Sequence, residues 1–505
     1  MNIEKNIKLP KNWLLTTIGE IGIIVSGGTP STQNKNYWGE EIPWITPSDL
    51  SKYTKKYISH GNRNISKEGL NNSSAKLLPK GTILFSSRAP IGYTVIAQNE
   101  LTTNQGFKNL IITESLSSEY VYYYFKTLKP IAEEVASGTT FLELSAQKFS
   151  KLQFPLAPLK EQLKIVTKLN ELFINIERTE SDLQNTLKKL NMYKYSMLHE
   201  IFNKQTSDRK IIKIKDLGTI VTGNTPSKNK SYYYGSEYNF YKPSDLTLYG
   251  KISESKEKLS YEGYYNTRII PENSIIVSCI GTIGKVGLIK KEGAFNQQLN
   301  AIIPNDNFLS EFIFYQLISL DFQNLLKRNT SATTISIINK SKFSHLDFIY
   351  YSKEKQEEIV QEIDYKLSII NNLELTIKEL IEKLILSKDK ILDEAFKGKL
   401  VSQEEDTQNA KELFKKIQKE KSRYLKEENK LKKNTIRERK TMKNDLSILE
   451  ILQKQNDYIL VNDLWKKSIH SNDIENVYSE LKRIEEYINI ENNNKESFIR
   501  IKNEN

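Results

Sequence analysis

Two long stretches of the chain place apolar residues at alternating spacings of four and three. In the first stretch these residues are Ile165, Leu169, Leu172, Ile176, Leu183, Leu190, Tyr193 and Met197, interrupted only at Thr179 and Thr186. The second stretch repeats the pattern 194 residues later with Ile359, Ile363, Ile370, Leu373, Ile377, Leu380, Leu384 and Ile391, interrupted at Lys366 and Ser387. This spacing is typical of coiled coils. It predicts two long spacer helices, at residues 158–204 and 351–400.

Two helices with matching apolar stripes in one chain most simply pair with each other. If an approximate two-fold axis relates the two halves of the chain, the helices run antiparallel. The alternative is that each helix packs only on its neighbouring domain. The strict 3.5-residue period favours the coiled coil, because a helix that packs on a globular surface keeps a period nearer 3.6.

Outside these helices the pattern changes to short apolar runs separated by turns. Thr82–Ser86 (TILFS) and Ser274–Ser278 (SIIVS) have the length and composition of buried strands. They predict α/β domains at residues 1–157 and 205–350. The expected fold class is therefore α+β, with two quasi-repeated α/β domains, an antiparallel coiled coil and a helical C-terminal extension.

The two predicted domains are copies of one unit. Residues 26–50 (SGGTPSTQNKNYWGEEIPWITPSDL) align without a gap to residues 222–246 (TGNTPSKNKSYYYGSEYNFYKPSDL), with 11 of 25 positions identical. Residues 78–92 match 270–284, and the Asn-Gln pair at 104–105 matches 296–297, both at an offset of 192. Small changes in the offset indicate loop insertions. The chain therefore contains an internal repeat of about 194 residues followed by a tail.

The charge of the chain, +12 over 505 residues, lies mainly in these copies. Each predicted domain carries +5, the two predicted helices carry +2 and −2, and residues 401–505 carry +2. Basic domains on nearly neutral helices suit domains that contact a polyanion such as DNA and helices that contact protein. The alternative is a surface of solvated lysines without a ligand.

Composition and motifs argue against several classes of function. One cysteine excludes a disulfide framework and a cysteine-cluster metal site, and four histidines leave little for zinc chemistry. No P-loop, dinucleotide fingerprint or adenine-methyltransferase motif is present, and Cys279 in its apolar run reads as structural. We find no apolar run of 18 residues and no signal-peptide pattern, so we expect a cytoplasmic protein. These features favour a binding protein over an enzyme.

At this point the motifs resemble a known family. GGTPS, YWG, IPWITPSDL, SSRAPIG, TTNQGF and SGTTF, followed by APLKEQLKIV, are similar to a target-recognition domain of the specificity (S) subunits of type I restriction–modification systems (the HsdS family). The second copy departs modestly, with GNTPS, YYYG, SCIGTIG, FNQQL and TSATTI before SKEKQEEIV. The resemblance covers roughly residues 10–400. Each motif alone is weak, and the doubled order of domain and helix is specific.

The resemblance implies a non-catalytic subunit that binds double-stranded DNA. Each recognition domain would read half of a bipartite target, and the coiled coil would set the gap. Two methyltransferase (M) subunits would dock on it to methylate adenine N6, and two restriction/motor (R) subunits would cut unmethylated DNA. S-adenosylmethionine, ATP and Mg²⁺ are expected in those partners and none in this chain, and no membrane is involved.

Candidate DNA-binding residues lie in turns rich in small and polar side chains, which let backbone N–H groups approach phosphate. In the first domain they are Ser26, Gly27, Thr29, Ser31, Ser87, Arg88, Asn104, Gln105, Thr139 and Thr140. In the second domain they are Thr222, Gly223, Thr225, Ser227, Thr282, Lys285, Asn296, Gln297, Thr333 and Thr334. Because most of these match between the copies, their pattern favours framework or backbone contacts over base reading, and turn-only roles suit the glycines.

Base-reading residues are expected where the copies diverge, at 52–63 and 247–258, although solvated loops explain these segments equally well. Glu161, Gln162, Lys355 and Gln356 open the two helices. We interpret them mainly as helix-start residues, and as methyltransferase contacts only by family analogy.

Residues 401–505 form the tail. Residues 401–444 read as a basic, solvated helical linker, with 14 basic and 5 acidic residues in 410–443, for which a DNA-phosphate role is the minor alternative. Residues 445–505 alternate helical and strand patterns in an order compatible with a winged helix, whose partner would be DNA or the motor subunit.

Two rival readings of the whole chain remain. One is an enzyme that has kept only its recognition half, which requires a catalytic motif that we do not find. The other is an architectural coiled-coil protein with non-specific basic domains. It predicts DNA affinity that collapses with salt and shows no sequence preference.

Overall fold

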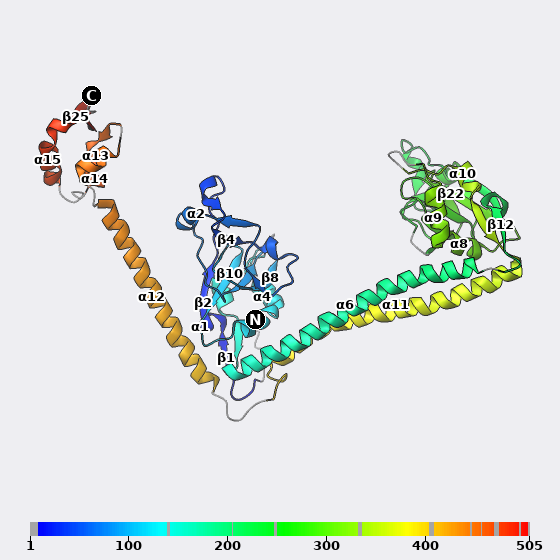
Figure 1. Ribbon diagram of the computed structural model, residues 1–505, viewed down its shortest axis with the longest axis horizontal. Helices are drawn as coiled ribbons and strands as arrows, with labels where there is room; N and C mark the ends of the chain where they lie inside the picture. Colours follow the sequence, from blue (N-terminus) through cyan, green and yellow to red (C-terminus); the bar gives the residue numbers. More distant parts are fainter. Residues whose placement is uncertain are drawn as a thin grey trace. The chain divides into compact units, whose positions relative to one another are not determined.

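The computed structural model describes residues 9–138, 142–204, 206–246, 250–331, 336–402, 409–444, 447–455, 457–468, 474–493 and 496–502. They form two compact units (Figure 1). One contains residues up to Leu172 together with residues from Asp389 onward, and the other contains Phe173–Lys388. Each unit holds one copy of the repeated domain. The expected fold class, two repeated α/β domains with long helices, is confirmed.

The first domain, residues 9–157 in the described ranges, packs its helices on a five-stranded sheet of order β2-β10-β7-β8-β5. A four-stranded sheet β3-β6-β4-β9 and the pair β1-β11 complete it. Its elements are β1 (Leu14–Thr17), α1 (Ile18–Ile21), β2 (Gly22–Ser26), β3 (Trp38–Gly39), β4 (Ile42–Ile45), β5 (Tyr57–Ile58), β6 (Arg63–Ile65), α2 (Lys67–Asn71), β7 (Ile83–Ser87), β8 (Ile91–Ala97), β9 (Thr102–Thr103), β10 (Phe107–Ile112), α3 (Ser118–Lys126), α4 (Lys129–Val135), α5 (Ala146–Ser150) and β11 (Gln153–Leu156).

The second domain repeats this topology with a five-stranded sheet of order β13-β22-β19-β20-β16. A second five-stranded sheet, β14-β17-β15-β21-β18, and the pair β12-β23 complete it. Its elements are β12 (Lys210–Lys213), β13 (Gly218–Thr222), β14 (Tyr234–Gly235), β15 (Tyr238–Tyr241), β16 (Gly250–Ile252), β17 (Lys258–Leu259), α7 (Tyr261–Tyr265), β18 (Ile269–Ile270), β19 (Ile275–Ser278), β20 (Val286–Ile289), β21 (Gly293–Phe295), β22 (Leu299–Pro304), α8 (Ser310–Ile318), α9 (Leu320–Arg328), α10 (Lys340–Ser344) and β23 (Asp347–Tyr350).

The centre of each domain is a buried strand that begins with three apolar residues, as the short apolar runs predict. In β7, Ile83, Leu84 and Phe85 are fully buried, and β19 buries Ile275 and Ile276 to the same extent. Both strands have a neighbour on each side in the sheet. Because successive side chains point to opposite faces of a strand and all of these are buried, both faces are covered by the domain. A continuous apolar run is the composition that such a doubly covered strand requires.

The two long helices are α6 (Leu159–Asn203) and α11 (Lys353–Phe396). Within the second unit they lie side by side and run antiparallel (Figure 1). The carboxylate of Glu180 on α6 lies 3.6 Å from the ammonium of Lys388 on α11. Further along α6, the ammonium of Lys194 lies 2.8 Å from the carboxylate of Glu374. Because the residue number rises on one helix as it falls on the other, the antiparallel coiled coil is confirmed.

The helix–helix seam differs by one residue in every heptad from the sequence prediction. Tyr193 and Leu373 are 54% and 46% exposed, whereas the next residues, Lys194 and Glu374, lie in the seam. The same shift of one residue occurs at five other positions. The seam contains Glu180, Leu187, Leu367, Ile381 and Lys388, where the prediction had Thr179, Thr186, Lys366, Leu380 and Ser387. The period of 3.5 was correct, but spacings of four-three and three-four satisfy it equally. The prediction took one of these two phases, and the structure adopts the other at these positions, so that choice was wrong.

The last turns of α11 pack on the first domain, inside the first unit. The ring of Phe396 lies 5.2 Å from that of Tyr120 and 5.0 Å from that of Tyr124, measured between centroids. Both tyrosines belong to α3, and both are almost fully buried. The helix end is therefore part of the core of this domain.

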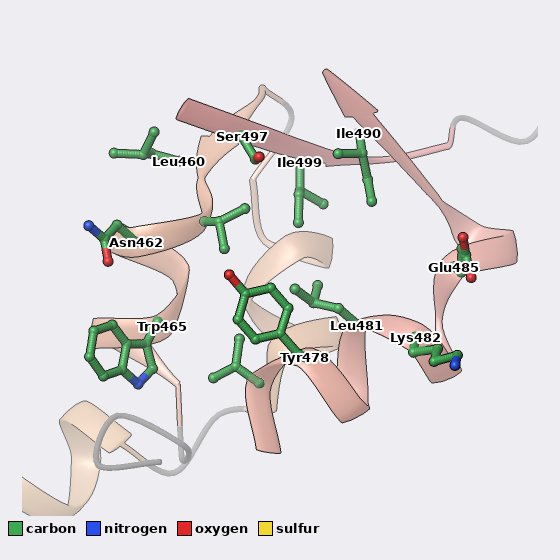
Figure 2. A pocket seen from close by; sticks show the side chains of 12 residues that line it. Leu460, Asn462, Trp465, Tyr478, Leu481, Lys482, Glu485, Ile490, Ser497 and Ile499 are labelled. Atoms are coloured by element: carbon green, nitrogen blue, oxygen red, sulfur yellow. The ribbon is translucent and has the colours of Figure 1, made fainter. Parts of the chain in front are cut away.

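The tail contains α12 (Ala410–Asn444), α13 (Ile448–Gln453), β24 (Ile459–Leu460), α14 (Val461–Lys467), α15 (Ile474–Arg483), β25 (Ile488–Asn493) and β26 (Glu496–Ile501). The three strands form a sheet of order β24-β26-β25. Helix, strand, helix, helix and a strand pair, with the first strand against the last, is the winged-helix arrangement. A cavity of about 640 Å³ lies in this small domain. Trp465, Tyr478 and Leu481 are among the residues that line it (Figure 2).

Candidate nucleic-acid interface

In both domains a glycine lets the turn after the first sheet strand touch a second turn. A Cβ atom added at Gly27 would lie 1.9 Å from the carbonyl oxygen of Asn104. At the matching Gly223 it would lie 2.2 Å from the carbonyl oxygen of Asn296. Since real Cβ atoms never approach so closely, only glycine fits here. The sequence named all four residues, and the structure brings them together in two equivalent pairs.

This contact makes a testable demand on stability. We expect Gly27→Ala to lower the free energy of unfolding of the first domain by about 1–3 kcal/mol, because the added methyl group forces two backbone segments apart. Gly39→Ala is the matched control, since a Cβ there meets nothing nearer than 3.7 Å. Urea unfolding followed by tryptophan fluorescence measures both. Equal stability of the two variants would contradict the close approach.

The paired asparagines shape their own turns. The Asn104 Oδ1 atom accepts a hydrogen bond from the Gly106 N–H at 2.9 Å, and the Asn296 Oδ1 atom accepts one from the Gln298 N–H at 3.2 Å. Asn296 is only 6% exposed. These contacts give both side chains a framework role, as their presence in both copies indicated.

The glutamines that follow them are exposed and available. In the first domain the Thr29 hydroxyl donates to the Gln105 Oε1 atom, and in the second the Thr225 hydroxyl donates to Gln297 in the same way. The sequence-predicted residues therefore include, in each domain, a pair of a half-buried threonine and an exposed glutamine. Ser26, Ser31 and Ser227, also predicted, are exposed beside these pairs in the sequence.

Three other predicted residues have contacts within the protein. Ser87 is fully buried and its hydroxyl donates to the Gly106 carbonyl at 3.1 Å, so the prediction of a DNA contact there was wrong: the end of β7 is covered by a turn. The Lys285 ammonium donates to the Pro243 carbonyl at 3.0 Å, and the Thr222 hydroxyl donates to Asn300 at 2.6 Å. Thr282 is exposed. Thr139, Thr140, Thr333 and Thr334 lie outside the described residues.

A cavity of about 530 Å³ opens in the first domain among four segments of the chain. The residues that line it are Thr46, Pro47, Ser48, Arg88, Ala89, Asn104, Gly106, Leu142 and Glu143. The Arg88 guanidinium lies 3.6 Å from the Glu143 carboxylate, and its side chain remains 36% exposed. The cavity thus presents a charged hydrogen-bond donor that a carboxylate holds in place.

A buried lysine completes this charged cluster. The Lys108 ammonium lies 3.7 Å from Glu143, and its side chain is only 7% exposed. The pKa of Lys108 is lowered from its usual value, mainly by burial and further by the positive charge of Arg88. The carboxylate of Glu143 acts in the opposite direction and raises this pKa. Sequence reasoning missed Lys108 and Glu143. The available signal was a lysine inside the apolar strand run FKNLII, where a charge needs a partner.

The second domain has different chemistry at the same place. The isolated bridge between Arg88 and Glu143 corresponds to a bridge between Ile280 and Ile337. At the next position inward Cys279 is buried, and burial raises the pKa of its thiol to about 12, so it is an inert thiol at neutral pH. The same framework therefore carries an ionic cluster in one domain and apolar side chains in the other.

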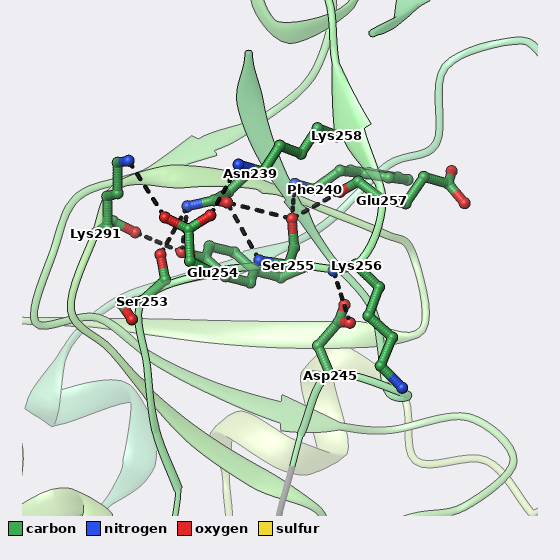
Figure 3. A network of polar contacts seen from close by, with 11 residues as sticks. Asn239, Phe240, Asp245, Ser253, Glu254, Ser255, Lys256, Glu257, Lys258 and Lys291 are labelled. Atoms are coloured by element: carbon green, nitrogen blue, oxygen red, sulfur yellow. Dashed lines mark hydrogen bonds and ion pairs between the residues drawn. The ribbon is translucent and has the colours of Figure 1, made fainter. Parts of the chain in front are cut away.

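The divergent segments, proposed as base readers, are partly fixed by internal contacts. In the first domain Lys56 forms an ion pair with Glu119 at 2.7 Å, whereas the Arg63 guanidinium stacks over the Trp38 ring at 3.7 Å. In the second domain, the buried Asn239 side chain holds the 253–258 segment (Figure 3). Its Nδ2 atom donates a hydrogen bond to the Ser253 carbonyl oxygen at 3.0 Å. Residues 247–249 lie outside the described residues. The exposed members Lys52, Lys55, Lys251 and Lys256 remain open to a ligand.

Three of the four residues that open the helices, Glu161, Gln162 and Gln356, are buried, whereas the Lys355 side chain is 38% exposed. Glu161 accepts from the Trp13 indole N–H at 2.7 Å, and Gln162 accepts from the Ser117 N–H at 3.1 Å. Gln356 does the same for the Leu309 N–H at 2.9 Å. Each of these side chains thus ties a long helix to its own domain.

Within the described ranges, no three His, Cys, Asp or Glu side chains are grouped to hold a metal ion. No helix in the part of the chain that the structure describes is long and apolar enough to span a membrane.

Two copies of one framework, with different chemistry at equivalent positions and a paired-helix connection, define a bivalent binding protein. The family model described as the type I restriction modification DNA specificity domain matches this chain twice, at residues 10–189 and 206–383. The chain therefore belongs to that family.

Curated relatives support this assignment over shorter spans. The MjaIX specificity subunit of Methanocaldococcus jannaschii is 36% identical over 288 residues, which are 53% of this chain and 66% of that protein. The HindI specificity subunit of Haemophilus influenzae is 36% identical over 183 residues, 34% of this chain and 40% of that protein. The chain thus spans just under two thirds of the length of the MjaIX subunit and two fifths of the length of the HindI subunit.

Solved structures show the same fold. The HsdS subunit of Thermoanaerobacter tengcongensis superposes with a TM-score of 0.54 at 17% identity, covering 79% of this chain and all of that one. A chain from a structure on complex assembly and conformational transition of the type I R-M system gives 0.62 at 18% identity, covering 78% of this chain and all of that one. About a fifth of this chain therefore has no counterpart in either structure.

Proposed function

We propose that this chain is the DNA sequence-specificity subunit of a type I restriction–modification complex. Each recognition domain binds one half of a bipartite target in double-stranded DNA, and the two helices set the gap between the halves. The observation that carries this proposal is the repeated framework with an ionic cluster at Arg88 in one copy and Ile280 in its place in the other. Equal frameworks with unequal linings suit two half-sites of different sequence.

The proposed complex supplies the chemistry from other chains. Two methyltransferase subunits would dock on this chain for adenine N6 methylation, and two motor–nuclease subunits would cut unmethylated DNA. The chain itself would be non-catalytic, and S-adenosylmethionine, ATP and Mg²⁺ would be held by its partners. Because its substrate is the chromosome and invading DNA, we place the complex in the cytoplasm.

The electrostatics of the domains support DNA as the ligand. Each domain carries +5, and exposed lysines accompany the Thr–Gln pairs. Phosphate contacts of this kind give affinity, whereas base contacts give sequence preference. In the first domain the Arg88 guanidinium suits the O6 and N7 atoms of guanine. In the second, Ile280 and Ile337 suit the methyl group of thymine.

Mapping adenine methylation across the host genome, with this gene intact and deleted, tests the proposal. We expect deletion to abolish methylation at one split motif on both strands and to leave other motifs unchanged. The motif would supply both half-sites and the gap. Duplex binding by the purified chain is the companion measurement, because it reports recognition when the methyltransferase is silent. Equal affinity for motif and random duplexes would contradict sequence specificity.

A further inference from the structure

Helix α12 lies beyond the residues that the family model matches, which end at 383. Its first turns are firmly attached to the first domain. Ala410 and Ile417 are fully buried, and Leu413 is 6% exposed. These three residues recur at spacings of three and four, so they form one face of the helix. The helix therefore has a defined inner face.

Polar contacts fix the same attachment along three turns. The Ala410 N–H donates to the Asn12 carbonyl at 3.0 Å, and the Gln418 side chain donates to the Glu20 carbonyl at 2.7 Å. Glu420 accepts from both the hydroxyl and the N–H of Ser115, at 2.5 and 3.3 Å. Such a set of contacts holds the helix as a rigid projection from the domain.

The outer face of this helix is basic. Exposed cationic side chains recur at Lys411, Lys415, Lys419, Arg423, Lys426 and Lys430, and we call this set the basic stripe. At 100° per residue they fall within a sector of about 120°, opposite the buried face. The stripe runs for about 28 Å. The attached face and the charged face are thus separate surfaces of one helix.

The stripe is largely free of compensating charge. Arg423 is paired with Glu427 at 3.0 Å, and Glu412 also lies on the outer half. The five lysines form no ion pair with any other residue that the structure describes. Unpaired cations spaced about 6 Å apart on a rigid rod can each meet about every second phosphate of a duplex strand, which carries a phosphate every 3.4 Å along the axis.

We propose that α12 is a sequence-independent DNA-binding arm that contacts phosphates of the duplex flanking the first half-site. This inference rests on the proposed function, because it takes DNA to be the ligand of the attached domain. Because α12 is attached to the domain that would bind DNA, the basic stripe is more suited to DNA than to an acidic protein. A helix of 35 residues spans about 52 Å, or about 15 base pairs.

The test compares two variants of the full chain with the same net charge. The stripe variant changes Lys411, Lys415, Lys419, Lys426 and Lys430 to glutamine. The control changes five exposed lysines of the long helices to glutamine: Lys188, Lys189, Lys378, Lys383 and Lys390. Fluorescence anisotropy measures binding of each protein to 60-base-pair duplexes, with the mapped motif or with random sequence, between 50 and 300 mM salt.

For the stripe variant we expect the magnitude of the slope of log K against log salt to fall by about 4–5, since each of the five lost phosphate contacts removes about 0.9. Affinity should fall at least tenfold for both duplexes, whereas the ratio between motif and random duplexes should stay unchanged. Shortening the flanks to 5 base pairs should weaken the wild type but not the stripe variant.

Equal slopes in the stripe variant and the control would overturn the proposal. A wild type that binds motif and random duplexes equally would instead overturn the proposed function. The two failures are therefore distinguishable, because the slope is independent of sequence preference.

Discussion

Replacing Lys194 with glutamate is expected to raise the hydrogen-exchange rate of the paired helices by about 100-fold. Lys194 and Glu374 lie 2.8 Å apart in the seam, and their side chains are only 7% and 18% exposed. Reversing one charge leaves two carboxylates facing each other with little water to screen them. Breaking such a pair costs about 3 kcal/mol, and 1.4 kcal/mol corresponds to a factor of ten.

Two controls separate the pair from a general charge effect. Lys189→Glu makes the same change on an exposed position of the same helix, and its exchange rate should stay within about twofold of the wild type. Adding Glu374→Lys to Lys194→Glu should restore most of the protection, because the pair is rebuilt in reverse. A swap that fails to rescue would show that packing, rather than charge, holds this layer.

The pair is also expected to select the register of the two helices. A slip of one heptad would place Lys194 against Leu367 or Ile381 instead of Glu374, and Glu180 would likewise lose Lys388. A polar residue in an apolar seam fixes register at some expense of stability. The double variant Lys194→Leu, Glu374→Leu should therefore be at least as stable as the wild type. We also expect the proposed complex that contains this variant to methylate motifs with more than one gap, which genome-wide methylation mapping detects.

Replacing Arg88 with isoleucine is expected to weaken binding to the motif by about 10–100-fold and to relax one base position in one half-site. This substitution gives the first domain the residue that the second domain has at this position. A bidentate arginine contact to guanine contributes about 1–3 kcal/mol of discrimination. The fold should persist, because Lys108 remains as a partner for Glu143. Binding to duplexes with single base changes in each half-site measures the effect.

Arg88→Lys distinguishes base reading from charge. Lysine keeps the charge beside Glu143 but lacks the planar pair of donors, so it should retain affinity for random duplexes and lose the preference at that base. Lys80→Gln, an exposed change elsewhere in the domain, should alter neither. If Arg88→Ile affects the motif and random duplexes equally, Arg88 is a phosphate contact and the base-reading assignment is wrong.

The sequence by itself determined the repeat, the fold class and the two long helices. These features follow from local pattern: apolar runs such as Thr82–Ser86 fit only covered strands, and a stripe of period 3.5 fits only paired helices. The turn glycines were also readable, because Gly27 and Gly223 recur in matched motifs.

Only the tertiary structure decided which side of the stripe faces the partner helix. Lys194 lies in the seam because Glu374 is there to pair with it, and no local pattern could favour it over the more apolar Tyr193. The same holds for the cluster of Arg88, Lys108 and Glu143, which are far apart in the sequence. A buried charge needs a partner that lies elsewhere in the chain. Such partners meet only when the chain folds, so local sequence patterns do not reveal them.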